Sequence, residues 1–380
     1  MKEVDQKIIK TLLGLLFFLP FCLNAQIGED SLKYLKRSTY LSDNPKINER
    51  DILVDSIVRS FMQSPQNCGL SIGISENGNS TFYNYGEMSR DSKMQTRPTT
   101  VYDIGSLTAS FTGYLLGLAV TEKKMSLEDD VRKFLPGEYK NLVFNKNPIR
   151  VKHLATHSSG LPHLPDDLIT QENYDPANPY KNYSREQIFI YLQRLQLTTA
   201  PGSVYDYSSL GLSVLGLVLE KVYGNRFDVL LREKITVHLE LDNTRVNLSG
   251  IHVLDYATGY TDEGVETPHW ILDGFTAAGS MNSSPADLLH FLEYQLEEKD
   301  AAAKLSRQVI LTADKKTTSL AWFVTTTKQG HTLMYQSGGT FGSGAFMGFL
   351  KEKNCSVVVI ANSGRNVDYV AIALLNYLQQ

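Results

Sequence analysis

The sequence predicts an α+β fold in which an antiparallel sheet, flanked by helices, is built from both ends of the chain around a mostly helical insertion. Alternating apolar residues near each end are typical of strands joined by short turns, whereas residues from about 105 to 310 show mainly helical spacing and long loops. The composition, 42% hydrophobic and 21% charged, is that of a folded globular protein. We therefore expect one large core and no internal repeat.

The elements that precede the insertion are a helix and a hairpin. The apolar spacing predicts a helix, ended by Pro65, whose buried face carries Leu53, Ile57, Phe61 and Met62. Alternation over residues 69–74 then runs into Glu76-Asn77-Gly78-Asn79, and apolar residues resume beyond it. Because Asn-Gly between two alternating runs is a strong hairpin signal, we expect two paired strands here.

The C-terminal end has the same pattern. We expect strands over 320–326, 331–336, 345–350 and 356–361, joined by short turns such as Lys328-Gln329-Gly330. An amphipathic helix from Val367 to Leu378 should follow them. Strands at both chain ends can then pair within one sheet.

The first 25 residues have the layout of a secretory signal peptide. Lys7 and Lys10 precede the apolar stretch 12–23, and Ala25 gives way to polar Gln26. That stretch is short for a bilayer span, so we expect an exported protein, periplasmic or secreted, without a membrane span after cleavage. The domain prediction is a signal peptide over 1–25, an arm or linker over 26–45, and one domain over 46–380.

Charge and cysteine usage exclude several classes of protein. A net charge of -4 without a cluster of Lys and Arg argues against a nucleic-acid partner. After signal cleavage only Cys68 and Cys355 remain, so a disulfide framework is excluded and a single disulfide is left open. His153 and His157 are four residues apart, but no carboxylate motif accompanies them, so we expect neither a metal nor a cofactor.

Ser106 stands at the start of an apolar helical run. Phe111, Tyr114 and Leu115 recur at helical spacing, which places Ser106 in the first turn. A lysine three residues later would direct its ammonium towards the serine hydroxyl, but this position holds Ala109. Taken alone, a serine here is also an ordinary residue at a helix N-terminus.

Six segments in order resemble the serine β-lactamase and penicillin-binding-protein superfamily, in particular its branch of class C β-lactamases, D-alanyl-D-alanine carboxypeptidases and related esterases. The resemblance runs from about Gly69 to the C-terminus and implies a β-lactamase-like fold with acyl transfer through Ser106. Each segment alone is weakly specific, whereas six in order are strongly so. They are 103–112, 127–136, 149–162, 201–209, 277–288 and 337–342.

The sequence departs from this family at all three active-site motifs. Ser-x-x-Lys keeps Ser106 but has Ala109 in place of lysine. Tyr-x-Asn resembles 207–209, with the tyrosine kept and the amide replaced, and Lys/His-x-Gly resembles 336–338, with a neutral amide in place of the cation. The backbone N–H groups of Ser106 and Gly339 would form the oxyanion hole. The resemblance thus implies Ser106 and Tyr207 as catalytic residues and, as substrate-binding residues, Ser209, Gln336, Ser337, Gly338 and Gly339.

Two hypotheses of different classes follow. The first is a serine hydrolase or acyltransferase of altered, weak activity on a small ester or amide, since a phenol titrates near ~10 and Tyr207 has lost both neighbouring cations. The second is a catalytically inactive pseudoenzyme that binds a peptidoglycan fragment, a peptide or a partner protein in the same cleft. A third possibility is a base supplied from elsewhere, for example His269. The loop that contains Tyr174, Tyr180 and Tyr183 is expected to overhang the cleft.

Overall fold

The computed structural model describes residues 40–246 and 255–380. The predicted signal peptide and most of the predicted 26–45 arm lie outside the described residues. Within them, no helix is both long and apolar enough to cross a membrane.

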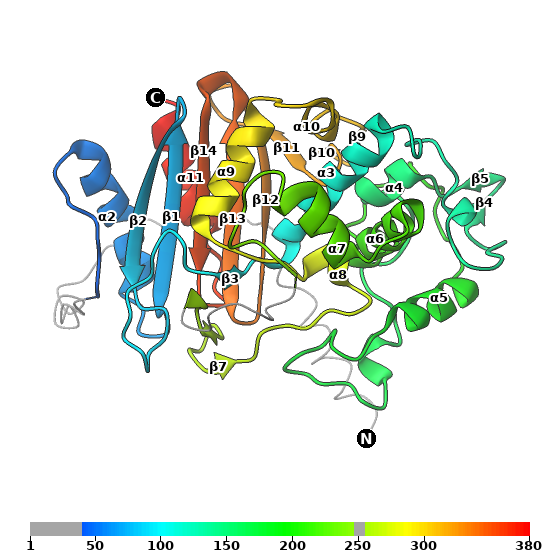
Figure 1. Ribbon diagram of the computed structural model, residues 1–380, viewed down its shortest axis with the longest axis horizontal. Helices are drawn as coiled ribbons and strands as arrows, with labels where there is room; N and C mark the ends of the chain where they lie inside the picture. Colours follow the sequence, from blue (N-terminus) through cyan, green and yellow to red (C-terminus); the bar gives the residue numbers. More distant parts are fainter. Residues whose placement is uncertain (1–39, 247–254) are drawn as a thin grey trace. The chain divides into compact units, whose positions relative to one another are not determined.

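An eight-stranded antiparallel sheet forms the centre of the fold and takes strands from both ends of the chain (Figure 1). N-terminal β1 pairs with C-terminal β14, with Ile72 opposite Val359. This sheet and the helices around it confirm the predicted α+β class. In sheet order the strands are β2 (Asn79–Gly86), β1 (Gly69–Glu76), β14 (Cys355–Ala361), β13 (Ser343–Leu350), β12 (Thr332–Thr340), β11 (Phe323–Thr326), β10 (Lys316–Thr318) and β9 (Leu311–Ala313).

The hairpin predicted from Asn-Gly is present between β1 and β2. Asn77 and Gly78 have φ values of 52° and 79°, the two left-handed residues of a type I′ turn. The C-terminal strands are confirmed with shifted ends, and β9 and β10 were not predicted. The expected strand 320–326 begins only at Phe323, because Ala321 has a φ of 58° and turns the chain before the strand.

Helices cover both faces of the sheet (Figure 1). On β14, Val357 and Val359 belong to the core under α2 (Glu49–Met62) and α11 (Asp368–Leu378), whereas Val358 and Ile360 face the larger core on the other side, which includes α9 (Pro285–Leu296). This alternation is the period of two expected of a strand buried on both faces.

The predicted N-terminal helix is confirmed as α2, and Phe61 and Met62 are buried as predicted, but the first half of its buried face was assigned wrongly. Val54 and Val58 are fully buried, whereas Leu53 and Ile57 are half-buried.

Asp51 and Asp55 are also buried on this face of the helix, and their charges hide the face in a pattern based on apolar residues. Asp51 accepts a hydrogen bond from the Tyr83 hydroxyl at 2.8 Å. Asp55 forms ion pairs with Lys46 at 2.8 Å and Arg59 at 3.1 Å, which compensate its burial.

The insertion is mostly helical, as predicted. Its helices are α3 (Thr108–Thr121), α4 (Val151–Ala155), α5 (Arg185–Arg194), α6 (Ser209–Tyr223), α7 (Phe227–Leu231), α8 (Thr276–Gly279), α9 and α10 (Ala301–Ser306), with shorter turns η2 (Gly105–Leu107), η3 (Val131–Lys133), η4 (Leu168–Thr170) and the π-turn η5 (Arg232–Thr236). Three two-stranded ribbons accompany them: β3 (Tyr102–Asp103) with β8 (Asn282–Ser283), β4 (Val143–Phe144) with β5 (Asn147–Pro148), and β6 (Gly259–Tyr260) with β7 (Glu266–Thr267). A further turn, η7 (Lys351–Lys353), joins β13 to β14.

Cys68 and Cys355 are both free and buried. Cys355 is opposite Glu76 at one end of β1, and Cys68 precedes Gly69 at the other end. An eight-residue strand separates the two thiols by about 25 Å. Because a disulfide needs its Cα atoms within about 7 Å, the two cysteines cannot pair in this fold.

Candidate active site

Ser106 lies in the 3-10 turn η2, directly before α3 rather than inside its first turn. The turn is held by Thr108, whose Oγ1 donates to the Gly105 carbonyl at 2.7 Å and accepts from the Met281 N–H at 3.1 Å. Gly105 has a φ of 50°, and a Cβ there would lie 2.2 Å from the Gly339 carbonyl oxygen. Only glycine therefore lets this turn lie against β12.

Two consecutive glycines bring the backbone of β12 to Ser106. A Cβ on Gly338 would lie 2.7 Å from the Ser106 Cβ, so a larger residue would displace the serine. Gly339 follows and lines the same pocket as Ser106. The backbone of β12 at Gly338 and Gly339 therefore lies against Ser106.

Tyr207 contacts Ser106 directly. Its hydroxyl donates a hydrogen bond to the Ser106 Oγ at 3.1 Å. Tyr207 is placed by the start of α6, where the N-cap Ser208 accepts from the Gly211 N–H and donates to the Pro162 carbonyl. Burial raises the pKa of Tyr207 above its ordinary value, and hydrogen bonding to Ser106 and Ser209 only partly opposes this. At neutral pH the phenol is therefore protonated and acts as a donor.

The aromatic neighbours of Tyr207 provide no positive charge. His157 and His163 lie with ring centroids 4.4 Å and 5.4 Å from the tyrosine ring. Burial lowers the pKa of His157 to about 4 and also lowers the pKa of His163. Among the described residues no lysine or arginine shifts the pKa of Tyr207. The phenolate thus lacks the stabilising charge that would make it abundant near pH 7.

The two positions where the family resemblance implies cations are buried and carry neutral residues. Ala109 is 0% exposed, and Gln336 is 1% exposed. The Gln336 amide donates to the Ala321 carbonyl at 2.7 Å, and so holds the turn before β11. Ser337, the next residue, donates to the Asp368 carboxylate of α11 at 2.6 Å. The structure therefore gathers five of the predicted site residues, Ser106, Tyr207, Ser209, Gly338 and Gly339, and engages Gln336 and Ser337 elsewhere.

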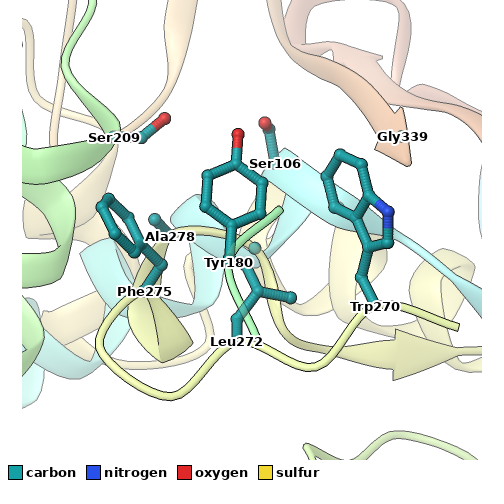
Figure 2. Close-up of a pocket in the computed structure, with 10 residues that line it drawn as sticks. Ser106, Tyr180, Ser209, Trp270, Leu272, Phe275, Ala278 and Gly339 are labelled. Atoms are coloured by element: carbon teal, nitrogen blue, oxygen red, sulfur yellow. The ribbon is translucent and has the colours of Figure 1, made fainter. Parts of the chain in front are cut away.

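The pocket beside Ser106 is small and has aromatic walls (Figure 2). Its volume is about 40 Å³, and none of the described residues that line it is charged. The Tyr180 ring contacts Trp270 and Phe275 at centroid distances of 5.1 Å and 5.2 Å. The full lining is Gly105, Ser106, Tyr180, Ser209, Trp270, Leu272, Phe275, Ala278, Gly279 and Gly339.

Sequence reasoning found part of this wall. Tyr180 comes from the loop that was expected to overhang the cleft, and Ala278 and Gly279 fall in a segment already noted for its family resemblance. It missed Trp270, Leu272 and Phe275, because they lie in an aperiodic stretch. Asn178 holds that stretch by donating to the His269 carbonyl and accepting from the Ile271 N–H, each at 3.0 Å. This contact depends on the fold and has no local signal.

His269 is engaged away from Ser106. Its Nδ1 lies 3.2 Å from an Asp103 carboxylate oxygen, and the Tyr256 hydroxyl bonds the other oxygen. The Tyr256 ring packs on the imidazole at 3.9 Å. In the described part of the chain His269 forms no hydrogen bond with Ser106, so this arrangement does not supply the missing base.

The structure places His153 and His157 in backbone-supporting roles. His153 Nδ1 accepts from the Arg150 N–H, and His157 Nδ1 accepts from the Ser208 N–H, each at 3.1 Å. Across residues 40–246 and 255–380, no group of three or more His, Cys, Asp or Glu side chains is arranged to hold a metal ion.

This fold, with its serine before a helix and a tyrosine on the serine hydroxyl, is that of the β-lactamase-like serine hydrolases. The family model described as "Beta-lactamase" matches residues 54–379. The chain therefore belongs to the β-lactamase family.

Individual relatives are distant. A β-lactamase of Pseudomonas fluorescens is 26% identical over 82% of this chain and 92% of its own length. The chain covers only 59% of a β-lactamase of Providencia stuartii, at 28% identity, and 65% of the Staphylococcus aureus protein flp, at 27% identity. The match therefore spans less than two thirds of several relatives.

Solved structures share the fold. The octameric penicillin-binding protein homologue from Pyrococcus abyssi matches with a TM-score of 0.75 and 25% identity, over 86% of this chain and 76% of that one. A β-lactamase/D-alanine carboxypeptidase from Pseudomonas syringae matches with a TM-score of 0.76 and 22% identity, over 87% of this chain and 99% of that one.

Proposed function

We propose that this protein is an exported serine hydrolase or acyltransferase with weak activity on small, neutral esters or amides. The observation that carries the proposal is the 3.1 Å hydrogen bond between Tyr207 and Ser106, at a pocket that Gly339 also lines. Export is proposed on the signal-peptide pattern of the first 25 residues.

The reaction would begin when the Ser106 Oγ attacks the substrate carbonyl carbon. The hydroxyl proton passes to the Tyr207 phenolate, and the carbonyl oxygen becomes an oxyanion that the Ser106 and Gly339 N–H groups stabilise. When the C–O or C–N bond breaks, Tyr207 returns that proton to the leaving group. Water or another acceptor then attacks the acyl carbon and gives its proton to the Tyr207 phenolate, and Tyr207 passes that proton to the Ser106 Oγ as the acyl bond breaks.

The neutral site explains why the activity should be weak. A positioned general base contributes about 10²- to 10⁴-fold, and the raised pKa of Tyr207 keeps the basic form scarce at pH 7. Esters with good leaving groups need less proton transfer and should react best. A pocket without a charged lining residue also offers no partner for a substrate carboxylate.

A second candidate is the inactive protein that binds a peptidoglycan fragment, a peptide or a partner in the same cleft. The buried, neutral residues at positions 109 and 336 favour it, because Ala109 belongs to the packed core and the Gln336 amide is hydrogen-bonded to the Ala321 carbonyl. A protein that binds such a ligand but leaves Ser106 unmodified by reactive esters would fit this candidate.

Steady-state hydrolysis of p-nitrophenyl butyrate tests the first candidate. We expect Ser106→Ala to reduce the rate to that of the buffer, and Ser110→Ala, on the next turn of the same segment, to retain it. An analogous ester with a free carboxylate should react about tenfold more slowly, since its carboxylate would lose hydration at a pocket that offers no charged partner. Equal rates for Ser106→Ala and the unmodified protein would refute the role of Ser106.

A further inference from the structure

We infer that His157 is the positioning residue for Tyr207. It bonds the backbone of the two residues that flank the tyrosine, and its ring packs against the tyrosine ring. Its consequence for acylation rests on the proposed function, whereas the placement itself does not. His157 lies just after α4, about 50 residues before Tyr207, and so joins two parts of the helical insertion.

The backbone neighbours of Tyr207 both bond to His157. The Asp206 N–H donates to the His157 carbonyl at 2.7 Å, and the Ser208 N–H donates to the His157 Nδ1 at 3.1 Å. One residue therefore binds the backbone N–H groups of the residues directly before and directly after the tyrosine. These two bonds restrict the backbone that carries the phenol.

The His157 ring restricts the Tyr207 side chain. The two rings lie 4.4 Å apart with an interplanar angle of 32°. Phe323 of β11 is nearly parallel to the imidazole at 6.3 Å, and Tyr205 meets it edge-on at 5.9 Å. The Tyr207 ring is also 6.4 Å from Phe323, so the three rings form one aromatic cluster in which the imidazole is the nearest neighbour of the tyrosine.

His157 has an unfavourable backbone conformation and a buried ring nitrogen without a hydrogen-bond partner among the described residues. Its φ of 54° is left-handed, a conformation that is unfavourable for a non-glycine residue. Because Nδ1 accepts a hydrogen bond, the neutral ring carries its proton on Nε2, which is buried without a hydrogen-bond partner among the described residues. The surrounding contacts impose both costs, and the gain that remains is the fixed position of Tyr207.

The test compares His157→Leu with His157→Asn. Leucine fills similar space but cannot accept from Ser208. Asparagine can accept through its amide oxygen and tolerates a left-handed φ. His153→Leu is the matched control, because it also removes an imidazole Nδ1 that accepts a backbone N–H in the same segment, but at Arg150.

Two readouts separate placement from function. The ζ-carbon NMR signal of labelled tyrosine, assigned to Tyr207 through Tyr207→Phe, reports the ring environment even if the protein has no activity. The rate of Ser106 labelling by a fluorophosphonate reports the consequence. We expect His157→Leu to move the Tyr207 signal and to slow labelling about 100-fold, as a misplacement near 1 Å does. His153→Leu should change neither, and His157→Asn should label within about threefold of the unmodified protein.

An unmoved Tyr207 signal in folded His157→Leu would overturn the inference, whatever the labelling rate. If His157→Leu does not fold, His157→Asn decides. A moved Tyr207 signal with labelling near that of the unmodified protein supports the positioning role of residue 157, because asparagine keeps the hydrogen-bond acceptor for Ser208 but lacks the aromatic ring. Labelling as slow as in Tyr207→Phe contradicts it. If the unmodified protein is not labelled at all, the proposed function fails, and the NMR signal still tests the placement.

Discussion

Replacing Tyr207 by phenylalanine should lower the rate of Ser106 acylation by about 10²- to 10⁴-fold, the range that a positioned general base contributes. The phenol is the group that hydrogen-bonds the Ser106 Oγ, at 3.1 Å. Phenylalanine keeps the ring contacts with His157 and His163 but cannot exchange a proton. The loss should therefore be in the rate of acylation, measured with an activated ester, and not in folding.

The pH dependence follows from the raised pKa of Tyr207. Since that pKa lies above 10, the phenolate fraction increases about tenfold with each pH unit from 7 to 9. The Ser106-dependent rate should rise by the same factor and show no plateau near neutrality. Rates measured with Ser106→Ala give the hydroxide background to be subtracted.

Tyr205→Phe is the control for this prediction. Tyr205 is two residues away, contacts the same His157 ring, and forms no hydrogen bond with Ser106. It should keep the rate and the pH slope. A rate that is already constant from pH 7 to 9 would contradict the assignment, because it would require a base with a much lower pKa.

Restoring the lysine with Ala109→Lys should have two opposite effects of large size. An ammonium within about 4–6 Å of Tyr207 would lower the pKa of the phenol by about 1–3 units. Acylation at pH 7 should then rise about 10- to 1000-fold. The same change puts a long charged side chain where Ala109 is fully buried, and should cost about 2–4 kcal/mol of the free energy of unfolding.

Ala119→Lys separates the two effects. Ala119 is also fully buried in α3, and lies ten residues, about 15 Å, further along the helix. It should show the same loss of stability by denaturant unfolding and no gain in acylation. If Ala109→Lys folds and also gains nothing, the neutral Gln336 or the aromatic wall limits the reaction instead of the missing lysine.

The fold class and most strands of the sheet could be predicted from the sequence, because the patterns that specify them are local. Asn77-Gly78 specifies the hairpin, and alternation along the C-terminal strands identifies β11 to β14, but not the short β9 and β10. The errors in the predicted elements come from features that apolar spacing does not record. Buried Asp51 and Asp55 shifted the apparent face of α2, and the left-handed Ala321 shortened β11, since neither tertiary hydrogen bonds nor a positive φ at alanine can be read from apolar spacing.

The site was predicted less evenly. Ser106, Tyr207 and Ser209 were found through motif resemblance, and the structure brings them together, although their roles remain predictions. Ser337 was predicted to bind substrate but faces α11, because side chains alternate between the two faces of the sheet along β12. Trp270 and Phe275 were missed because Asn178 and the Tyr183–Gly274 backbone bond place them from distant segments.

The most direct test of the central claim, that Ser106 is nucleophilic without a lysine, is the mass of the intact protein after incubation with a fluorophosphonate. The account predicts one adduct, which forms faster at pH 9 than at pH 7 and is absent in Ser106→Ala. A parallel incubation with a penicillin should label more slowly, because the pocket has no cation for its carboxylate. A folded protein that acquires no adduct at either pH would contradict the claim and leave ligand binding as the function of the cleft.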